Sequence, residues 1–183
     1  DQGIDDNTIV IFTSDNGGAW YTGLPHLNRP FRGWKATFFE GGVRVPFFLR
    51  WPGHVAPGQR IATPVGHLDV FATAAAAAQA PLPHDRQIDS VNLLPFAQGQ
   101  RHGPVHEALF WRSGDYRAVR VGDWKLQVSE NPERMWLFNL AADPYEHEDL
   151  SAREPERVRE LRALIEAQNA VMPAPLWPNL LEG

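Results

Sequence analysis

One short stretch near the start of the chain constrains its fold more than any other. The run Ile9–Phe12 is apolar and mostly β-branched, and within two residues it leads into the polar segment Asp15–Gly18. A uniformly apolar run of this length predicts a buried strand. Open α/β sheets collect ligands just beyond the carboxyl ends of their strands. The sequence therefore predicts an α/β sheet with two oxygen donors, Asp15 and Asn16, at the edge where such folds place their chemistry.

The polar segment also has an ordinary interpretation, because Asp, Asn and Gly are the commonest turn residues. The motifs downstream argue against that interpretation. A basic turn precedes a second apolar strand, and its motifs are Arg-Gly-Trp-Lys-Ala-Thr at 32–37, Glu-Gly-Gly-Val-Arg-Val-Pro at 40–46 and Arg-Trp-Pro-Gly at 50–53. Together with Thr-Ser-Asp-Asn-Gly-Gly at 13–18, these motifs resemble the sulfatase family of the alkaline-phosphatase-like superfamily. Segments 110–112, 119–126 and 137–144 resemble the C-terminal subdomain of that family.

The resemblance implies roles for three residues. Asp15 and Asn16 match the late pair of calcium ligands, and Lys35 matches the lysine that contacts the sulfate ester and neutralises its charge. A divalent cation and an ammonium would stabilise the negative charge that collects in the transition state. Calcium takes hard oxygen ligands, whereas related zinc enzymes favour imidazole, so Asn16 favours calcium. Trp34 departs from the family pattern, in which many members have glycine, and we expect it to alter the wall of the site.

Other residues near these motifs have weaker assignments. His26 lies in the expected active-site loop and is a candidate for contacting the substrate, although a loop residue facing water is the alternative. Arg32 is a second candidate for binding an anionic substrate. Arg44 is expected to hold the Glu40–Gly42 turn, and His67 to be structural.

The catalytic nucleophile is not in this sequence. Sulfatases make a formylglycine from Cys or Ser in a short Cys/Ser-x-Pro-x-Arg motif, and the chain has no cysteine and no serine with proline two positions on. The early Asp-Asp metal pair of the family is absent too, since Asp5-Asp6 precedes the first strand and is expected to be a solvated turn. We therefore expect the chain to be the C-terminal part of a longer sulfuric ester hydrolase, and to be inactive alone.

Two alternatives stay open at this point. The first is a phosphodiesterase or phosphonate monoester hydrolase on the same scaffold. The second is a carbohydrate-binding remnant that keeps the fold without the chemistry. An upstream nucleophile motif would favour an enzyme, and its absence a binding module.

The composition limits the classes of partner that the chain is expected to bind. The formal net charge of −5 has no long runs of one sign, which argues against nucleic acid. No apolar run approaches the ~20 residues that span a membrane. The expected partner is a sulfated small molecule or carbohydrate, and an exposed edge of a parallel sheet would allow the chain to associate with itself. The residues leave the compartment open, while the resemblance implies a periplasmic or secreted protein.

The expected organisation has four parts. Residues 1–81 form the C-terminal part of a catalytic α/β domain, 82–106 a linker, 107–172 a small antiparallel β subdomain with a C-terminal helix, and 173–183 an extended tail. The first part contains strands at 8–15 and 45–51 and an alanine-rich helix that Pro81 ends. The β subdomain has strands at 108–112, 116–121, 124–128 and 135–140, and a helix from about 153 to 170. In strand 124–128 apolar residues alternate with Lys125 and Gln127, which predicts one buried and one wet face.

Overall fold

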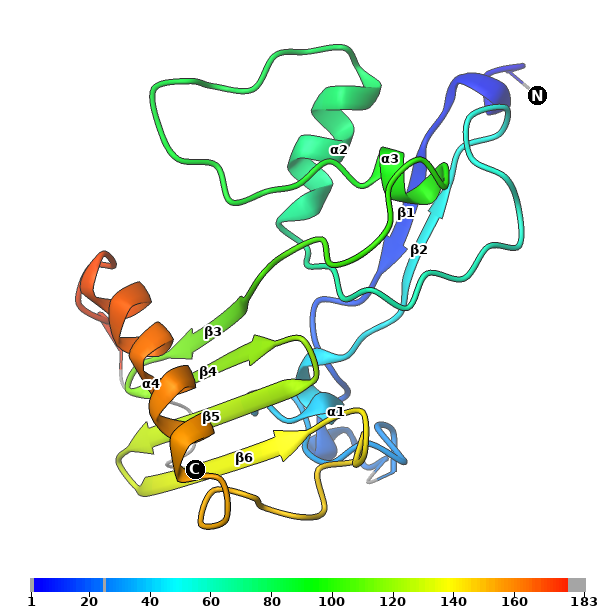
Figure 1. Ribbon diagram of the computed structural model, residues 1–183. Coiled ribbons are helices and arrows are strands. Elements are labelled where there is room, and N and C mark those ends of the chain that lie inside the picture. The colour runs from blue at the N-terminus through cyan, green and yellow to red at the C-terminus, as the bar shows by residue number, and fades with distance from the viewer. Residues whose placement is uncertain (1, 25, 178–183) are drawn as a thin grey trace. The chain divides into compact units, whose positions relative to one another are not determined.

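The computed structural model describes residues 2–24 and 26–177, and the chain forms two compact units (Figure 1). The first unit consists of Asp1–Asp15 and Pro46–Glu107, and the second of Asn16–Val45 and Ala108–Gly183. The long segment between the first two strands thus belongs to the second unit. The sequence predicted a division into consecutive parts, whereas the second unit includes a segment from within the predicted first part.

The first unit is built on a pair of strands, β1 (Val10–Thr13) and β2 (Phe47–Arg50). They pair antiparallel, with Val10 opposite Arg50 and Thr13 opposite Phe47. The expectation of a parallel sheet is wrong for this pair. A parallel pair needs a crossover connection that returns the chain to its starting end. In its described residues, the connecting segment instead has two short helical turns, η2 (Trp20–Thr22) and α1 (Glu40–Val43).

Short helices complete the described part of the first unit, namely η1 (Asp5–Asn7), α2 (Asp69–Ala77) and α3 (Leu94–Ala97). Its core is small and centres on the buried side chains of Leu93, Phe96 and Val105. The Asp69 carboxylate is fully buried and accepts hydrogen bonds from the backbone N–H of Val91, at 2.9 Å, and from the ring of His106. These contacts fix the predicted linker against the alanine-rich helix.

Strand β1 differs from its prediction as a fully buried strand. Its residues alternate between exposed and half-buried, and so do those of β2. Phe12 and Phe48 are opposite each other, with ring centroids 6.1 Å apart, and each is 64% exposed. One face of this sheet packs within the unit, and the other presents aromatic surface.

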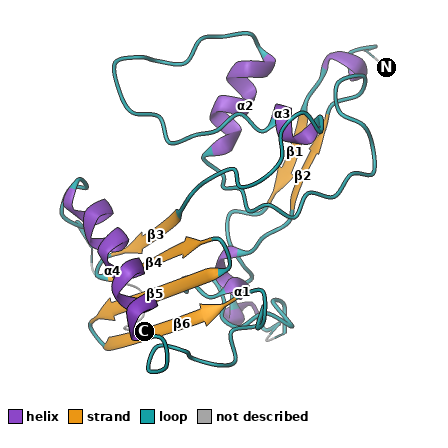
Figure 2. Cartoon of the chain, in the orientation of Figure 1, coloured by secondary structure: helices purple, strands orange, loops and turns teal. Residues whose placement is uncertain are grey.

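The second unit contains a four-stranded antiparallel sheet in the order β3-β4-β5-β6 (Figure 2). Its elements are β3 (Leu109–Ser113), β4 (Tyr116–Val121), β5 (Trp124–Glu130), β6 (Glu133–Asn139) and α4 (Pro155–Ala170). Gly122, with φ of 56°, makes the tight turn between β4 and β5. The predicted antiparallel subdomain and its C-terminal helix are confirmed.

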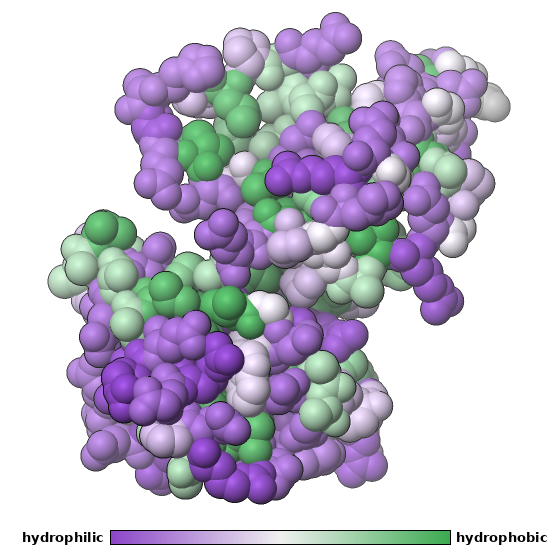
Figure 3. All heavy atoms as spheres, viewed as in Figure 1, coloured by the Kyte–Doolittle hydropathy of each residue, from purple (hydrophilic) through white to green (hydrophobic). Residues whose placement is uncertain are grey.

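Both faces of this sheet are covered. On one face, Leu126 and Leu137 pack with Leu161 of α4 in a continuous apolar cluster. The outer side of α4 is hydrophilic (Figure 3) and carries ion pairs between arginine and glutamate. On the other face, Lys125 and Gln127 have no exposed surface. The predicted wet face of β5 is therefore wrong, because the segment between β1 and β2 folds over it and brings Phe39 against Phe138.

Two further expectations concern membranes and the tail. Among residues 2–24 and 26–177, no helix has the length and apolarity needed to cross a bilayer. In the tail, the carbonyl of Pro173 accepts a hydrogen bond of 3.0 Å from Arg112. The remainder of the predicted extended tail, from residue 178 on, lies outside the described residues.

Candidate active site

The segment Asn16–Val45, which we name the site loop, is held together by backbones packed directly on one another. The N–H of Gly17 donates to the carbonyl of Gly42 at 2.8 Å. A Cβ on Gly17 would lie 1.7 Å from the carbonyl oxygen of Gly41, and one on Gly42 would lie 2.1 Å from that of Thr37. Only glycine fits at such an approach. The glycines of the two motifs therefore join the loop's two ends.

The side chain of Asn28 also holds the site loop together, through hydrogen bonds to its backbone. Its side-chain oxygen accepts from the N–H of Gly18 at 2.7 Å, and its amide nitrogen donates to the carbonyls of Gly18 and Gly33, at 2.8 and 3.2 Å. The N–H of Lys35 donates to the Gly18 carbonyl as well, at 3.3 Å. Sequence reasoning missed Asn28. The only available signal was an amide in a loop already suspected of function.

Lys35 lies in a tight turn. The N–H of Thr37 donates to the carbonyl of Trp34 at 3.0 Å, and the Thr37 hydroxyl bonds both the N–H and the carbonyl of Trp34. Ala36 has φ of 79°, a conformation uncommon for a residue with a Cβ. The Lys35 side chain is exposed beside this constrained residue. The turn thus presents an ammonium from a backbone fixed on both sides.

The predicted metal ligands lie where the two units meet in sequence. Asp15 is the last residue of its segment in the first unit and is exposed, while Asn16 begins the site loop and is half-buried. The Asn16 side-chain nitrogen donates to the carbonyl of Gly17 at 2.9 Å, so its oxygen is the atom suited to a cation. The ring of His67 bonds the carbonyl of Ser14 at 2.7 Å, which fixes the backbone just before Asp15. Carboxylate and amide oxygens fit calcium in kind.

These two residues do not make a complete site. Calcium takes about six to eight oxygen ligands. Within the described part of the chain, no group of three or more His, Cys, Asp or Glu side chains is placed to hold a metal ion. The metal roles of Asp15 and Asn16 remain predictions, and they require ligands from elsewhere.

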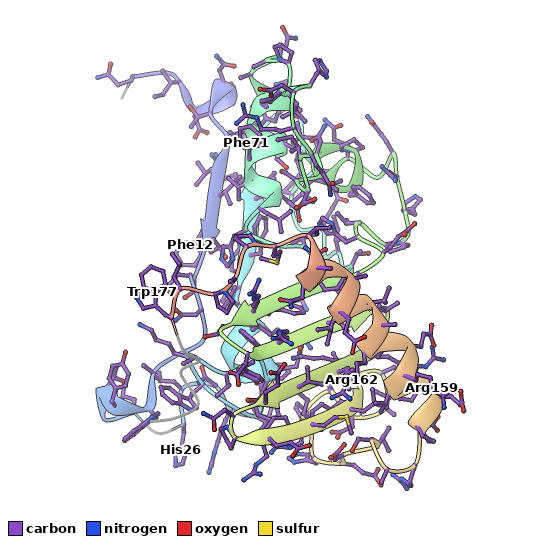
Figure 4. The ribbon with its side chains drawn as sticks, turned by 90° about the vertical axis from the view of Figure 1, so that its left-hand side faces the viewer. Phe12, His26, Phe71, Arg159, Arg162 and Trp177 are labelled. Atoms are coloured by element: carbon purple, nitrogen blue, oxygen red, sulfur yellow. The ribbon has the colours of Figure 1, made fainter. Side chains whose placement is uncertain are left out.

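The two candidate substrate contacts differ in their surroundings. His26 is exposed at the outer edge of the site loop (Figure 4). The Arg32 guanidinium lies 4.1 Å from the centre of the Phe39 ring and donates to the carbonyl of Glu146 at 3.0 Å. Arg32 therefore helps to fasten the site loop, and its role toward substrate stays a prediction, as does that of His26.

A buried ionic cluster fastens the site loop to the sheet. Lys125 donates to Glu40 at 2.9 Å and lies 3.1 Å from Glu146, and none of the three side chains is more than 3% exposed. Glu146 also accepts from the backbone N–H of Glu40 at 2.5 Å. One ammonium thus joins α1 of the site loop to β5 and to the segment after β6.

Neutral groups extend this cluster. Gln127 donates to Glu146 at 3.3 Å and accepts from the Tyr116 hydroxyl, which in turn accepts from the N–H of Phe38 at 2.9 Å. Burial raises the pKa of Tyr116 well above its ordinary value, so its hydroxyl stays a donor. Burial also raises the pKa of Glu146, against the opposing charge of Lys125. The cluster is the largest feature that sequence reasoning missed, because alternation along β5 indicated water on that face.

Arg44 takes the place expected for it. Its guanidinium lies 3.6 Å from Glu40 Oε2, and that of Arg120 lies 3.8 Å from the same atom. This oxygen is buried and accepts no hydrogen bond from the described residues. The two arginines therefore balance its charge by proximity, and Arg44 holds the Glu40–Gly42 turn from within the site loop.

A family model described as Sulfatase matches residues 1–80, which include β1, the site loop and β2. Rat (Rattus norvegicus) steryl-sulfatase is 36% identical over 148 residues, which cover 78% of this chain and 25% of that protein. The chain belongs to the sulfatase family. An N-acetylgalactosamine-6-O-sulfatase of Bacteroides thetaiotaomicron is 33% identical over 186 residues and covers 88% of this chain and 36% of its own length. The chain thus spans about a quarter to a third of these curated sulfatases.

A solved structure shares the fold of this chain. Ps i-CgsB in complex with k-i-k-neocarrahexaose has a TM-score of 0.81 and 29% identity, and the match covers 97% of this chain and 40% of that one. The match covers both units, so the β-pair, the site loop and the four-stranded sheet with its helix all have counterparts in that structure.

Proposed function

We propose that this chain is the C-terminal part of a sulfatase that hydrolyses sulfate esters, and that Asp15, Asn16 and Lys35 belong to its active site. The observation that carries the proposal is the set of hydrogen bonds that joins the two parts of the site loop containing Asn16 and Lys35. Asn16 and Lys35 lie on adjoining backbone segments, joined by the Lys35 N–H to Gly18 carbonyl bond and locked by Asn28. The proposed cation ligand Asn16 and the exposed ammonium of Lys35 thus belong to one hydrogen-bonded loop.

In this proposal each of the three residues helps to stabilise negative charge on the sulfate group, either directly or through a bound cation. The Lys35 ammonium neutralises the sulfate group and stabilises the negative charge that develops as the ester bond breaks. Asp15 and Asn16 contribute oxygens to a calcium ion, which when bound supplies a fixed positive charge to the same group. The formylglycine nucleophile and the other ligands lie outside this chain. The 183 residues alone are expected to turn over no sulfate ester.

The substrate proposed is a sulfated carbohydrate. The Bacteroides relative is named for N-acetylgalactosamine 6-O-sulfate, and Ps i-CgsB was solved with an oligosaccharide. The steryl-sulfatase relative keeps a sulfated small molecule with an apolar body as the competing class. Assays with a sulfated sugar and with an aryl sulfate distinguish the two classes.

The deciding experiment replaces Lys35 by Ala in the full-length protein. We expect kcat/KM for an aryl sulfate to fall by about 10²–10³-fold, because one preorganised charge on the transition state is lost. The matched control is Arg162→Ala, which removes an exposed cation from α4 on the opposite face of the sheet (Figure 4). A near-normal rate in Lys35→Ala would exclude the role of Lys35.

The same assays separate the remaining enzyme class. Aryl sulfate and aryl phosphate are compared with calcium and with manganese. Sulfate turnover that depends on calcium supports the proposal, and faster phosphate turnover with manganese overturns it in favour of a phosphoesterase. Asp15→Ala should weaken calcium binding measured by calorimetry, and unchanged affinity would exclude it as a ligand.

A further inference from the structure

Three aromatic rings of the site loop, two exposed and one half-buried, pack together as a corner. Trp20, Tyr21 and Trp34 pack edge to face, with centroid separations of 5.9, 6.3 and 6.4 Å and interplanar angles of 71–87°. Trp20 is 60% and Tyr21 61% exposed. Large aromatic side chains that stay this exposed commonly mark a binding surface. We name these three residues the aromatic corner.

The aromatic corner is tied to the backbone that carries Lys35. Trp34 directly precedes Lys35, and Trp20 comes two residues after Gly18. The Lys35 N–H bonds the Gly18 carbonyl, so the two tryptophans flank one hydrogen bond. The backbone that carries the corner is therefore hydrogen-bonded to the backbone that carries Lys35.

We propose that the aromatic corner binds the pyranose ring of a sulfated sugar whose sulfate group lies at Lys35. This inference rests on the proposed function and assigns a specificity role to Trp20 and Trp34. Lys35 and Arg29 are exposed in the same loop, and their positive charge suits an anionic ligand. Aromatic rings bind the C–H face of a sugar, and exposed donors beside them suit its hydroxyl and sulfate groups.

The three rings are held together by contacts with one another. Trp34 packs edge to face against Trp20 and Tyr21, so the three rings form one aromatic cluster. In the proposed complex, the C–H face of the sugar ring packs on an exposed face of this cluster, and its sulfate group extends toward Lys35.

The test compares the effect of each substitution on kcat/KM for two different substrates, in the full-length protein. Trp34→Gly and Trp20→Ala are assayed with N-acetylgalactosamine 6-sulfate and with 4-methylumbelliferyl sulfate. We expect kcat/KM for the sugar to fall at least about tenfold, mainly through KM, while the aryl sulfate changes less than about threefold. The matched control is Trp177→Ala, which removes an indole that is 75% exposed in the tail (Figure 4) and should change neither substrate.

Three results would overturn the inference. In the first, both corner variants keep sugar turnover within about twofold of the original protein. In the second, both substrates lose rate equally, which would mean that the variants disturb Lys35 instead. In the third, Trp20 and Tyr21 are protected from oxidative labelling in the full-length protein without ligand, which would mean that other parts of that protein cover the corner.

A separate measurement keeps this inference distinct from the proposed function. Quenching of tryptophan fluorescence by N-acetylgalactosamine 6-sulfate, compared with unsulfated N-acetylgalactosamine, reports binding without chemistry. If no sulfate ester is hydrolysed, the proposed function fails, yet quenching that is lost in Trp20→Ala and kept in Trp177→Ala still supports the corner. Equal quenching in both variants overturns it.

Discussion

The β-pair of the first unit and the four-stranded sheet of the second differ in what covers their faces. In the first unit, Phe12 and Phe48 leave one face of the pair largely exposed. In the second, α4 covers one face with an apolar cluster, and the site loop covers the other with Phe39 and the ionic cluster. The second unit supplies both of its own covers, whereas the described residues of the first leave one face open.

This difference indicates where each unit gets its stability. The second unit fully buries apolar side chains such as Leu126 and also the charged side chain of Lys125. A buried charge destabilises the fold unless its ion-pair partners are present. The first unit relies on a smaller core, and its open aromatic face offers a surface for association. The site loop belongs to the better-packed unit, so its geometry depends on the second unit.

The largest effect we predict comes from the ionic cluster. Lys125→Met would leave Glu40 and Glu146 buried without their cation, and should lower the free energy of unfolding by about 3–5 kcal/mol. The chain contains only one other lysine, the exposed Lys35, so Lys35→Met is a matched control and should change stability by less than about 0.5 kcal/mol. Urea denaturation measures the loss, and hydrogen exchange of β5 amides localises it.

Lysine reactivity gives a check without mutation. An amine-labelling reagent followed by mass spectrometry should modify Lys35 quickly and Lys125 only when the second unit opens. Equal labelling of the two lysines in the folded chain, or equal stability of the two variants, would contradict the contrast between the units.

The two strand patterns show why sequence periodicity misjudged both sheets. Alternation along β5 reports side-chain chemistry, and Lys125 and Gln127 are polar, yet a polar side chain can be buried when its partners are supplied from far along the chain. Those partners, Glu40 and Glu146, are 85 and 21 residues from Lys125. Conversely, a uniformly apolar sequence indicates that a strand favours burial, but it does not indicate whether another segment packs over that strand.

A second prediction compares the apolar residues of the two units. Leu137→Ala should cost about 2–5 kcal/mol, because Leu137 is fully buried between the sheet and α4 and the cavity cannot close completely. Phe12→Ser removes a larger side chain from the open face and should cost less than about 1 kcal/mol. The same variant should reduce self-association of the chain in sedimentation experiments. A cost for Phe12→Ser equal to that for Leu137→Ala would mean that the β-pair is covered in solution.

Much of the site frame could be predicted from local motifs, while its connections could not. Asp15–Gly18 and Glu40–Gly42 were recognisable as glycine-containing turns, and Arg44 as the residue expected to hold the second of them. The sequence could not predict the close approach between the two glycine motifs or the hydrogen bonds of Asn28. These contacts join distant segments at single positions and leave no periodic pattern in the sequence. Lys35 and Asn16 keep their predicted roles as proposals for the same reason, since no ligand position follows from sequence.

The smallest effect we predict is a change in the pH dependence of stability through Glu146. Burial raises the pKa of this carboxyl above its ordinary value of 4.5, and Lys125 only partly offsets the shift. The folded chain therefore holds this proton more tightly than the unfolded chain does. The resulting stabilisation is fully present below the ordinary pKa and is lost as pH rises through the raised one.

Glu146→Gln removes this titration and keeps the shape of the side chain. Relative to the original chain, the variant should become progressively more stable as pH rises from about 4.5 toward neutrality, with the two curves converging at the acid end of that window. Urea midpoints measured across the window test this, with Glu148→Gln, a nearby exposed carboxyl, as the control. If the Glu146→Gln curve instead falls below the original as pH rises, Lys125 outweighs burial, and the cluster stabilises the second unit most at neutral pH.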